Sequence, residues 1–260
     1  MDALKDRVAV ITGAAQGQGA AEARLLAAHG AHVVITDLQE AGRALAEDIG
    51  ASAPGSAEFI RLDVTDEQAW GALADDLRDR HGRLDVLVNN AGVAFRFGMM
   101  ETTRDDFEHV LAVNLVGPFL AMRALAPLMR DSGGGSIVNV GSAAGMTGHF
   151  SAAYSTSKWG LRGVTKVAAM EFASWNIRVN AIHPGIVNTA LVPGDTAFPQ
   201  AMTRFTPLGR AAEVEDVAPL VFFLAGDGSR FITGSDFPVD GGLVDLGVYD
   251  AVAKEYQNLK

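Results

Sequence analysis

The chain contains no cysteine among its 260 residues. This absence excludes disulfide bonds, thiolate nucleophiles and metal sites built on thiolates. The first residues lack the basic and then apolar pattern of a secretory signal. No uninterrupted apolar run approaches the roughly 18 residues that a membrane span requires. We therefore expect a soluble, cytoplasmic protein that makes no contact with a membrane.

Positive charge is also scarce in this sequence. The chain has 21 Lys and Arg against 31 Asp and Glu, which gives a formal net charge of −10. The basic residues form no run, so a polyanion such as nucleic acid would be repelled rather than bound. The six histidines follow no ligand spacing, and we expect no metal site.

Short segments rich in valine and isoleucine alternate with longer amphipathic segments. The strand candidates are residues 7–12, 31–36, 57–63, 84–89, 136–141, 177–182 and 236–240. The helix candidates are residues 17–29, 40–50, 66–81, 104–131, 152–174 and 213–225. This alternation predicts an α/β fold in which helices cover both faces of a parallel sheet.

No linker of low complexity divides the chain, so we expect residues 1–260 to form a single dinucleotide-binding catalytic domain. The stretch of about 185–212 contains several prolines. It is expected to be a long loop or a helical flap over the substrate. Residues of about 243–260 form a tail beyond the last expected strand.

A glycine-rich turn follows the first expected strand and opens the first expected helix. Its glycines are Gly13, Gly17 and Gly19, with Gln16 and Gln18 between them. Glycine lets the backbone approach a pyrophosphate, and the helix N-terminus then offers free N–H groups to it. The same turn could also serve a purely structural role, so it does not establish a nucleotide site by itself.

A carboxylate at the end of the second expected strand supports the nucleotide interpretation. Asp37 lies 18 residues after Gly19, where an acidic side chain can bind the adenine ribose hydroxyls. Its charge would repel the additional phosphate of NADP, and the neighbouring Gln16 and Leu38 supply no positive charge. We therefore expect NAD rather than NADP. The alternative role for Asp37 is a cap on the helix that follows.

Two further motifs close expected strands at the same edge of the sheet. Asp63 and Val64 follow the third strand, and Asn90, Ala91 and Gly92 follow the fourth. Ligands of open parallel sheets bind beyond the carboxyl ends of the strands. Asp63 can accept the adenine amino group, and the second motif can place backbone against the nucleoside. That second motif would equally serve as a simple strand-ending turn.

Tyr154 and Lys158 form the most informative pair in the chain. Residues four positions apart lie on the same face of a helix. A nearby ammonium favours phenolate and lowers the pKa of a tyrosine, which is ordinarily about 10. We expect this effect to make Tyr154 a general acid and base near neutral pH.

These motifs together resemble those of the short-chain dehydrogenase/reductase family, in the family's order. The matching elements are residues 12–19, Asp63, residues 89–92, Asn114, Ser142, residues 154–158, residues 184–185 and residues 239–242. The resemblance implies a single-domain, Rossmann-like, doubly wound α/β fold with a seven-stranded parallel sheet. It also implies a homotetramer, with a dimer as the alternative. The sequence looks most similar to bacterial NAD-dependent hydroxysteroid and secondary-alcohol dehydrogenases.

The resemblance also implies roles for individual residues. Tyr154 would exchange a proton with the substrate oxygen, Ser142 would hold that oxygen, and Lys158 would bind the nicotinamide ribose. Asn114 would hold a water that links Lys158 to solvent; alternatively, it is a buried bridging residue. The segment of Pro184, Gly185, Val187 and Thr189 would pack against the nicotinamide.

One departure from the family pattern concerns the loop before Tyr154. Ser142 precedes Tyr154 by twelve positions, where thirteen is the commoner spacing in the family. We expect this shorter loop to affect the shape of the pocket more than its chemistry. Ser151 in this loop is either a substitute hydroxyl for Ser142 or the N-cap of the tyrosine helix.

The loops expected to enclose the substrate are mainly apolar. Their large side chains are Phe95, Phe97, Met146, Phe150, Leu191, Val192, Phe198, Met202 and Phe205. Arg96 and Arg204 are the available cations. We expect a neutral, apolar secondary alcohol or ketone, of the hydroxysteroid or the cyclic or aryl alcohol type. The alternatives are an NADP-preferring ketoreductase and a non-catalytic dinucleotide sensor.

Overall fold

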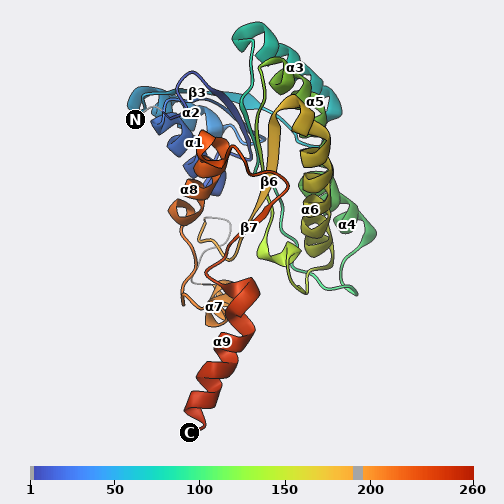
Figure 1. Ribbon diagram of the computed structural model, residues 1–260. Coiled ribbons are helices and arrows are strands. Elements are labelled where there is room, and N and C mark those ends of the chain that lie inside the picture. Colours follow the sequence, from blue (N-terminus) through green and yellow to red (C-terminus); the bar gives the residue numbers. More distant parts are fainter. Residues whose placement is uncertain (1–2, 190–195) are drawn as a thin grey trace.

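The computed structural model describes residues 3–189 and 196–260, and its centre is a seven-stranded parallel sheet (Figure 1). The strands are β1 (Val8–Thr12), β2 (His32–Asp37), β3 (Ser56–Arg61), β4 (Val86–Asn89), β5 (Gly135–Val140), β6 (Ile177–Pro184) and β7 (Asp236–Val239). Their order across the sheet is β3-β2-β1-β4-β5-β6-β7. The predicted single-domain α/β fold is therefore confirmed.

Helices cover both faces of this sheet. The α-helices of the described residues are α1 (Gly17–Ala28), α2 (Ala41–Ser52), α3 (Glu67–His81), α4 (Arg104–Leu111), α5 (Gly117–Asp131), α6 (Ala152–Phe172), α7 (Ala197–Arg204), α8 (Val214–Ala225) and α9 (Leu243–Asn258). Buried residues of α1, α2 and α8 form one core cluster, and those of α3, α5 and α6 form the second. Figure 1 shows these two groups on opposite sides of the strands.

Strand β1 shows why the central strands are apolar throughout. Ala9 and Ile11 pack into the first cluster, whereas Val8 and Val10 pack into the second. Because alternate side chains of a strand point to opposite faces, a sheet covered on both sides needs apolar residues at every position. All five residues of β1 are buried.

The sheet order also determines where a ligand can bind. Strand β1 pairs with β2 on one side and with β4 on the other, so the chain reverses its direction of winding between β1 and β4. In open α/β sheets the ligand crevice lies beyond the carboxyl ends of the strands at such a switch point. Thr12 ends β1 there, and its Oγ1 accepts hydrogen bonds from the Asn90 and Ala91 N–H groups at 3.0 and 2.9 Å.

The single helix predicted for residues 104–131 is divided in the structure. Helix α4 is followed by a π-helical segment, Ala112–Val116, before α5 begins. The helical stretch Arg104–Asp131 is apolar and long enough to cross a membrane by composition, but 56% of its most apolar window is buried inside the domain. Its apolar character is therefore consistent with a core helix.

Both C-terminal segments contain a helix in the structure. Helix α7 lies within the expected flap, whereas Leu191 and Val192 lie outside the described residues. Helix α9 projects away from the sheet (Figure 1). Its start is held by Asp240, whose carboxylate accepts hydrogen bonds from the Gly242 and Val244 N–H groups at 2.9 and 2.8 Å.

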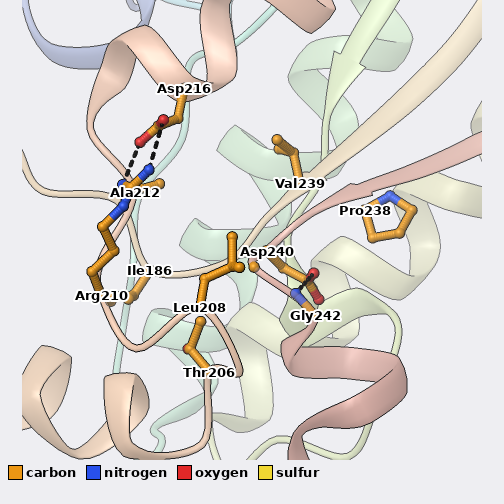
Figure 2. Close-up of a pocket in the computed structure, with 11 residues that line it drawn as sticks. Ile186, Thr206, Leu208, Arg210, Ala212, Asp216, Pro238, Val239, Asp240 and Gly242 are labelled. Atoms are coloured by element: carbon orange, nitrogen blue, oxygen red, sulfur yellow. Dashed lines mark hydrogen bonds and ion pairs between the residues drawn. The ribbon is translucent and has the colours of Figure 1, made fainter.

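A small cavity of about 330 Å³ lies beside this junction (Figure 2). Its walls come from Ile186, residues 206–216 and residues 238–242. The Arg210 guanidinium donates to both oxygens of Asp216, at 2.6 and 3.0 Å. These two charges neutralise each other, so Asp240 is the remaining charged side chain among the described lining residues, and both of its oxygens already accept backbone N–H groups.

Candidate active site

A larger cleft, of about 1030 Å³, lies along the carboxyl ends of the central strands. It brings together nearly all of the site residues expected from the sequence. Those that line it are Gly13, Gln16, Gly17, Gln18, Asp37, Leu38, Asp63, Val64, Asn90, Ala91, Gly92, Ser142, Tyr154, Lys158, Pro184, Gly185, Val187 and Thr189. Gly19 and Asn114 are not part of the lining.

The glycine-rich turn is shaped by backbone conformation and by close packing. Gly13 and Gly17 have φ values of +61° and +58°, a region that favours glycine. A Cβ at Gly13 would lie 2.7 Å from the Ala91 Cα. A Cβ at Gly19 would lie 2.5 Å from the Asn90 Nδ2, so Gly19 serves the packing of the turn rather than its open surface.

Asn90 fastens the turn after β1 to the end of β4. Its Nδ2 donates to the carbonyl oxygens of Thr12 and Gly13, at 2.9 and 3.0 Å. The side chain is thus occupied in holding two loops together. Ala91 and Gly92, next along the chain, place backbone in the lining of the cleft.

Two carboxylates lie at the opposite end of the cleft from Tyr154. Asp37 accepts hydrogen bonds from the Ala15 and Gln39 N–H groups at 3.0 and 2.9 Å. Asp63 accepts from the backbone N–H and the hydroxyl of Thr65, at 2.9 and 2.7 Å. These bonds hold the pKa of Asp63 below its usual value, so this side chain is an ionised acceptor at neutral pH.

The cations of the cleft lie away from Asp37. Of the Lys and Arg side chains in residues 3–189 and 196–260, Lys158 and Arg96 are those that line it. The lining residues beside Asp37 in sequence, Leu38 and Gln39, carry no charge. Nothing in the described lining therefore offsets the negative charge of Asp37.

Ser142 and Lys158 meet beyond the end of β5. Ser142 follows this strand by two residues and its Oγ accepts a hydrogen bond from the Ala144 N–H at 3.2 Å. Lys158, on α6, is 4% exposed, and its Nζ donates to the Val140 carbonyl at 2.8 Å. Burial lowers the pKa of Lys158 to about 8, which still leaves most of the side chain charged at neutral pH.

The expectation for the Tyr154 pKa is not met in this structure. Burial raises the pKa of the phenol above its ordinary value, while the Ser142 hydrogen bond and the charge of Arg96 act in the opposite direction. The Lys158 ammonium lies 5.7 Å from the centre of the tyrosine ring and donates to Val140. Desolvation therefore outweighs the favourable interactions of the phenolate, and the pKa of Tyr154 stays above its ordinary value.

Asn114 is placed in the π-helical segment and is 1% exposed. Its Oδ1 accepts from the Val93 N–H at 2.8 Å, and its Nδ2 donates to the Val93 carbonyl at 2.9 Å and to Ser157 Oγ at 3.2 Å. These contacts agree with the alternative interpretation, a buried residue that joins α6 to the loop after β4.

The substrate end of the cleft is more polar than the sequence suggested. Phe95, Phe198 and Met202 line it, but so do Arg96 and His149. The remaining described residues of the expected wall, Phe97, Met146, Phe150 and Phe205, are absent from the lining.

Arg96 and His149 were not predicted to take part in the chemistry. The Arg96 guanidinium lies 4.6 Å from the centre of the Phe198 ring. The His149 ring lies 6.4 Å from that of Tyr154. Burial and the charge of Arg96 lower the pKa of His149. Both residues belong to loops, where spacing gives no signal for convergence.

Ser151 precedes α6 but does not cap it through its side chain. The residue is fully buried and lines the cleft. Within the described residues, its Oγ has no hydrogen-bond partner. A buried hydroxyl without a partner is available to a polar atom of a ligand.

Comparison with known proteins identifies relatives over nearly the whole chain. The family model described as "Enoyl-(Acyl carrier protein) reductase" matches residues 13–244. The "Trans-4-hydroxycyclohexanecarboxylate dehydrogenase" of Sinomonas cyclohexanicum is 45% identical over 249 residues, covering 93% of this chain and 94% of that protein. The "3-alpha-(or 20-beta)-hydroxysteroid dehydrogenase" of Mycobacterium tuberculosis (strain CDC 1551 / Oshkosh) is 40% identical over 243 residues, with 93% and 90% covered.

A solved structure shows the same fold. The structure of a short-chain type dehydrogenase/reductase from Mycobacterium ulcerans superimposes with a TM-score of 0.89 at 29% sequence identity. The match covers 95% of this chain and 94% of that one.

Proposed function

This chain belongs to the short-chain dehydrogenase/reductase family, and we propose that it interconverts a secondary alcohol and its ketone with NAD(H), using Tyr154 as the acid and base. The family and the relatives support the coarser statement directly: the protein is an oxidoreductase of the secondary-alcohol dehydrogenase type that uses a nicotinamide dinucleotide. The observation that carries the finer proposal is the shared cleft, in which Ser142, Tyr154 and Lys158 line one end and the glycine-rich turn and Asp37 line the other.

The residues of the cleft fit a dinucleotide. The turn at Gly13 and Gly17 leaves backbone uncovered at the N-terminus of α1, where a pyrophosphate is favoured. Asp37 and Asp63 supply acceptors for the adenosine hydroxyls and amino group. Lys158 supplies a donor for the nicotinamide ribose. When bound, the nicotinamide accepts or supplies the hydride.

Tyr154 and Ser142 would act on the hydroxyl group of the substrate, from which a proton must be removed during oxidation. As the carbinol hydrogen leaves with its electron pair, the substrate O–H bond breaks and its proton moves to Tyr154, which begins this step as the phenolate and ends it as the neutral phenol. Ser142 donates a hydrogen bond to the substrate oxygen, which keeps it aligned with Tyr154. In ketone reduction the same proton returns to the substrate oxygen. Asn114 keeps α6 in register with the loop at Val93 while this occurs.

NAD is the proposed cofactor because a negative charge lies at the adenosine end of the cleft. The carboxylate of Asp37 would repel an additional phosphate, and the lining there offers no cation to balance it. This is the reason to set an NADP-preferring ketoreductase second. The complete set of Ser142, Tyr154 and Lys158 disfavours a non-catalytic sensor.

The substrate class is proposed from the cleft lining and the relatives. Phe95, Phe198 and Met202 favour an apolar cyclic or steroidal alcohol. Arg96 supports a second candidate, a cyclic alcohol that carries a carboxylate, because its guanidinium could pair with that group. One relative is named for such a compound and another for a hydroxysteroid.

The proposed function also includes an oligomeric state and a cellular location. Exposed apolar side chains on α9, among them Leu246, Tyr249 and Tyr256, favour a homotetramer, with a dimer as the alternative. We place the protein in the cytoplasm, with a small-molecule partner and neither nucleic acid nor membrane.

The test of this proposal is to remove the phenolic oxygen of Tyr154 and measure turnover. Purified protein is assayed with NAD+ against cyclohexanol, trans-4-hydroxycyclohexanecarboxylate and a hydroxysteroid, by the absorbance of the reduced nicotinamide. We expect turnover of at least one of these, and we expect Tyr154→Phe to lower kcat by roughly 10²–10⁴-fold, the usual contribution of an acid–base group. Tyr249→Phe, the same change on the exposed α9, is the control. Full turnover by Tyr154→Phe would refute the proposed role.

A further inference from the structure

Two histidines and a glutamate converge at the edge of the sheet opposite the cleft. His32 is the first residue of β2, Glu58 lies near the start of β3, and His81 is the last residue of α3. His32 precedes Asp37 by five residues of the same strand. At about 3.3 Å per residue, the cluster is about 16 Å from the cleft along β2.

The three side chains present their ligand atoms to a common point. Glu58 Oε1 lies 3.2 Å from His32 Nε2 and 3.1 Å from His81 Nε2. One ligand atom from each residue lies within 4.8 Å of the others. Tetrahedral zinc with bonds of about 2.0–2.1 Å keeps its ligand atoms about 3.3 Å apart. The observed separations are therefore close to those of a three-ligand zinc site.

Neighbouring groups hold these ligands in place. His32 Nδ1 lies 2.6 Å from Ser56 Oγ. When Nδ1 carries the hydrogen and donates a hydrogen bond to this oxygen, the lone pair is on Nε2. The second oxygen of Glu58 pairs with Arg80, which also binds Asp76. Metal-bound histidines and carboxylates are commonly oriented by hydrogen bonds of this kind.

The exposure of the cluster also suits a cation. The side chains of His32, Glu58 and His81 are 25%, 25% and 19% exposed. An ion can reach them from solvent, and water can supply a fourth ligand.

We infer that His32, Glu58 and His81 form a binding site for Zn2+ that joins the amino ends of β2 and β3 to the end of α3. The ligand set of two imidazoles and one carboxylate matches the preferences of zinc. The alternative is a cluster held by hydrogen bonds alone, in which both imidazoles donate to the same carboxylate oxygen. This second arrangement needs no ion and predicts no metal affinity.

The experiment measures metal binding by the full-length, tag-free protein. Titration calorimetry with ZnCl2 should show one saturable site per chain. At a free zinc concentration 100-fold above Kd, the unfolding midpoint should rise by roughly 5–10 °C for a chain of this size. With Co2+ in place of Zn2+, the visible absorption of a four-coordinate ion should develop at the same stoichiometry. These three measurements do not depend on enzymatic activity, so they test the zinc site independently of the proposed function.

Variants then assign the site to the cluster. His81→Gln and Glu58→Gln should each weaken zinc binding by at least about 10-fold and abolish the zinc-induced rise. Glu47→Gln, which removes an exposed carboxylate of α2, should leave both unchanged. The unfolding midpoint of each variant with zinc is compared with that of the same variant without zinc. If His81→Gln or Glu58→Gln fails to fold, His32→Gln takes its place. The inference would be overturned if the unmodified chain had no saturable zinc site, or if the ligand variants bound zinc as tightly as the unmodified chain.

Discussion

At the residue scale, Asp37 shows that one side chain can serve both the fold and the ligand. Its two oxygens accept N–H groups from Ala15, in the glycine-rich turn, and from Gln39, after β2. These bonds fix the carboxylate at the edge of the cleft. The structural and the cofactor interpretations of Asp37 are therefore compatible, since a fixed charge discriminates between cofactors better than a mobile one.

Cofactor preference should follow from this charge. We expect the unmodified chain to favour NAD, and the double variant Asp37→Asn with Leu38→Arg to shift the ratio of kcat/KM for NADP over NAD by roughly 100-fold, or about 2.7 kcal/mol. Asp37→Asn removes a negative charge that repels the additional phosphate of NADP, and Leu38→Arg adds a positive charge that attracts it. Leu38→Gln, which adds no charge, is the control. Steady-state kinetics with both cofactors would contradict this account if the unmodified chain preferred NADP.

The pairing of the proposed catalytic residues could be predicted from spacing, but their electrostatics could not. Tyr154 and Lys158 are four residues apart, which is sufficient to place them on one face of α6. The direction of the Lys158 ammonium depends on the Val140 carbonyl at the end of β5, which lies 18 residues earlier in the sequence. Arg96, whose charge lowers the Tyr154 pKa, comes from a third segment. Such convergence arises only from the tertiary fold.

At the element scale, α1 contains an uncommon buried group. Glu22 is fully buried, and neither of its carboxyl oxygens has a hydrogen-bond partner within the described residues. Burial raises the pKa of Glu22 to about 8, with a smaller opposing effect of Gln18. The folded chain therefore holds a proton on Glu22 at pH values where the unfolded chain has released it.

This proton makes stability depend on pH in a defined direction. Between pH 4.5, the ordinary value, and about 8, the native state binds more protons than the unfolded state. The Glu22 contribution to the free energy of unfolding must then fall as pH rises, by up to roughly 1.4 kcal/mol per pH unit. Glu22→Gln should flatten this decline and be relatively more stable than the unmodified chain at pH 8 than at pH 5.

Urea unfolding at several pH values measures this effect. Glu47→Gln, on the exposed face of α2, should retain the original pH dependence. If the difference in stability between Glu22→Gln and the unmodified chain did not vary with pH, Glu22 would not hold the proton assigned to it.

The boundaries of the elements show what local sequence can specify. The predicted strand at residues 84–89 begins two residues before β4, although the Asp85 backbone already hydrogen-bonds to Val8 and Ser136 on the neighbouring strands. The break between α4 and α5 was not expected, although asparagine is a poor helix former. The cause is tertiary: Asn114 bonds the Val93 backbone and Ser157.

At the scale of the whole molecule, a parallel sheet covered on both faces could be predicted from the sequence, because its central strands are apolar at almost every position and alternate with helices. The His32, Glu58 and His81 cluster was not accessible. Its members are distant in sequence and meet through the register in which His32 pairs with Ser56. The helical form of residues 243–258 was not predicted either.

That surface leads to a prediction about assembly. Tyr249, Val252 and Tyr256 recur at helical spacing on α9 and are 80%, 56% and 60% exposed. Apolar side chains in such a row on a helix that projects from the domain are stabilised when another surface covers them.

In light scattering at micromolar concentration we expect the mass of four chains, or of two. Tyr249→Asp should reduce this mass because it places a charge in the covered row. Asn258→Asp adds the same charge on the opposite face of α9 and should leave the assembly intact. A monomeric unmodified chain, or an equal response to both substitutions, would exclude α9 as the contact between subunits.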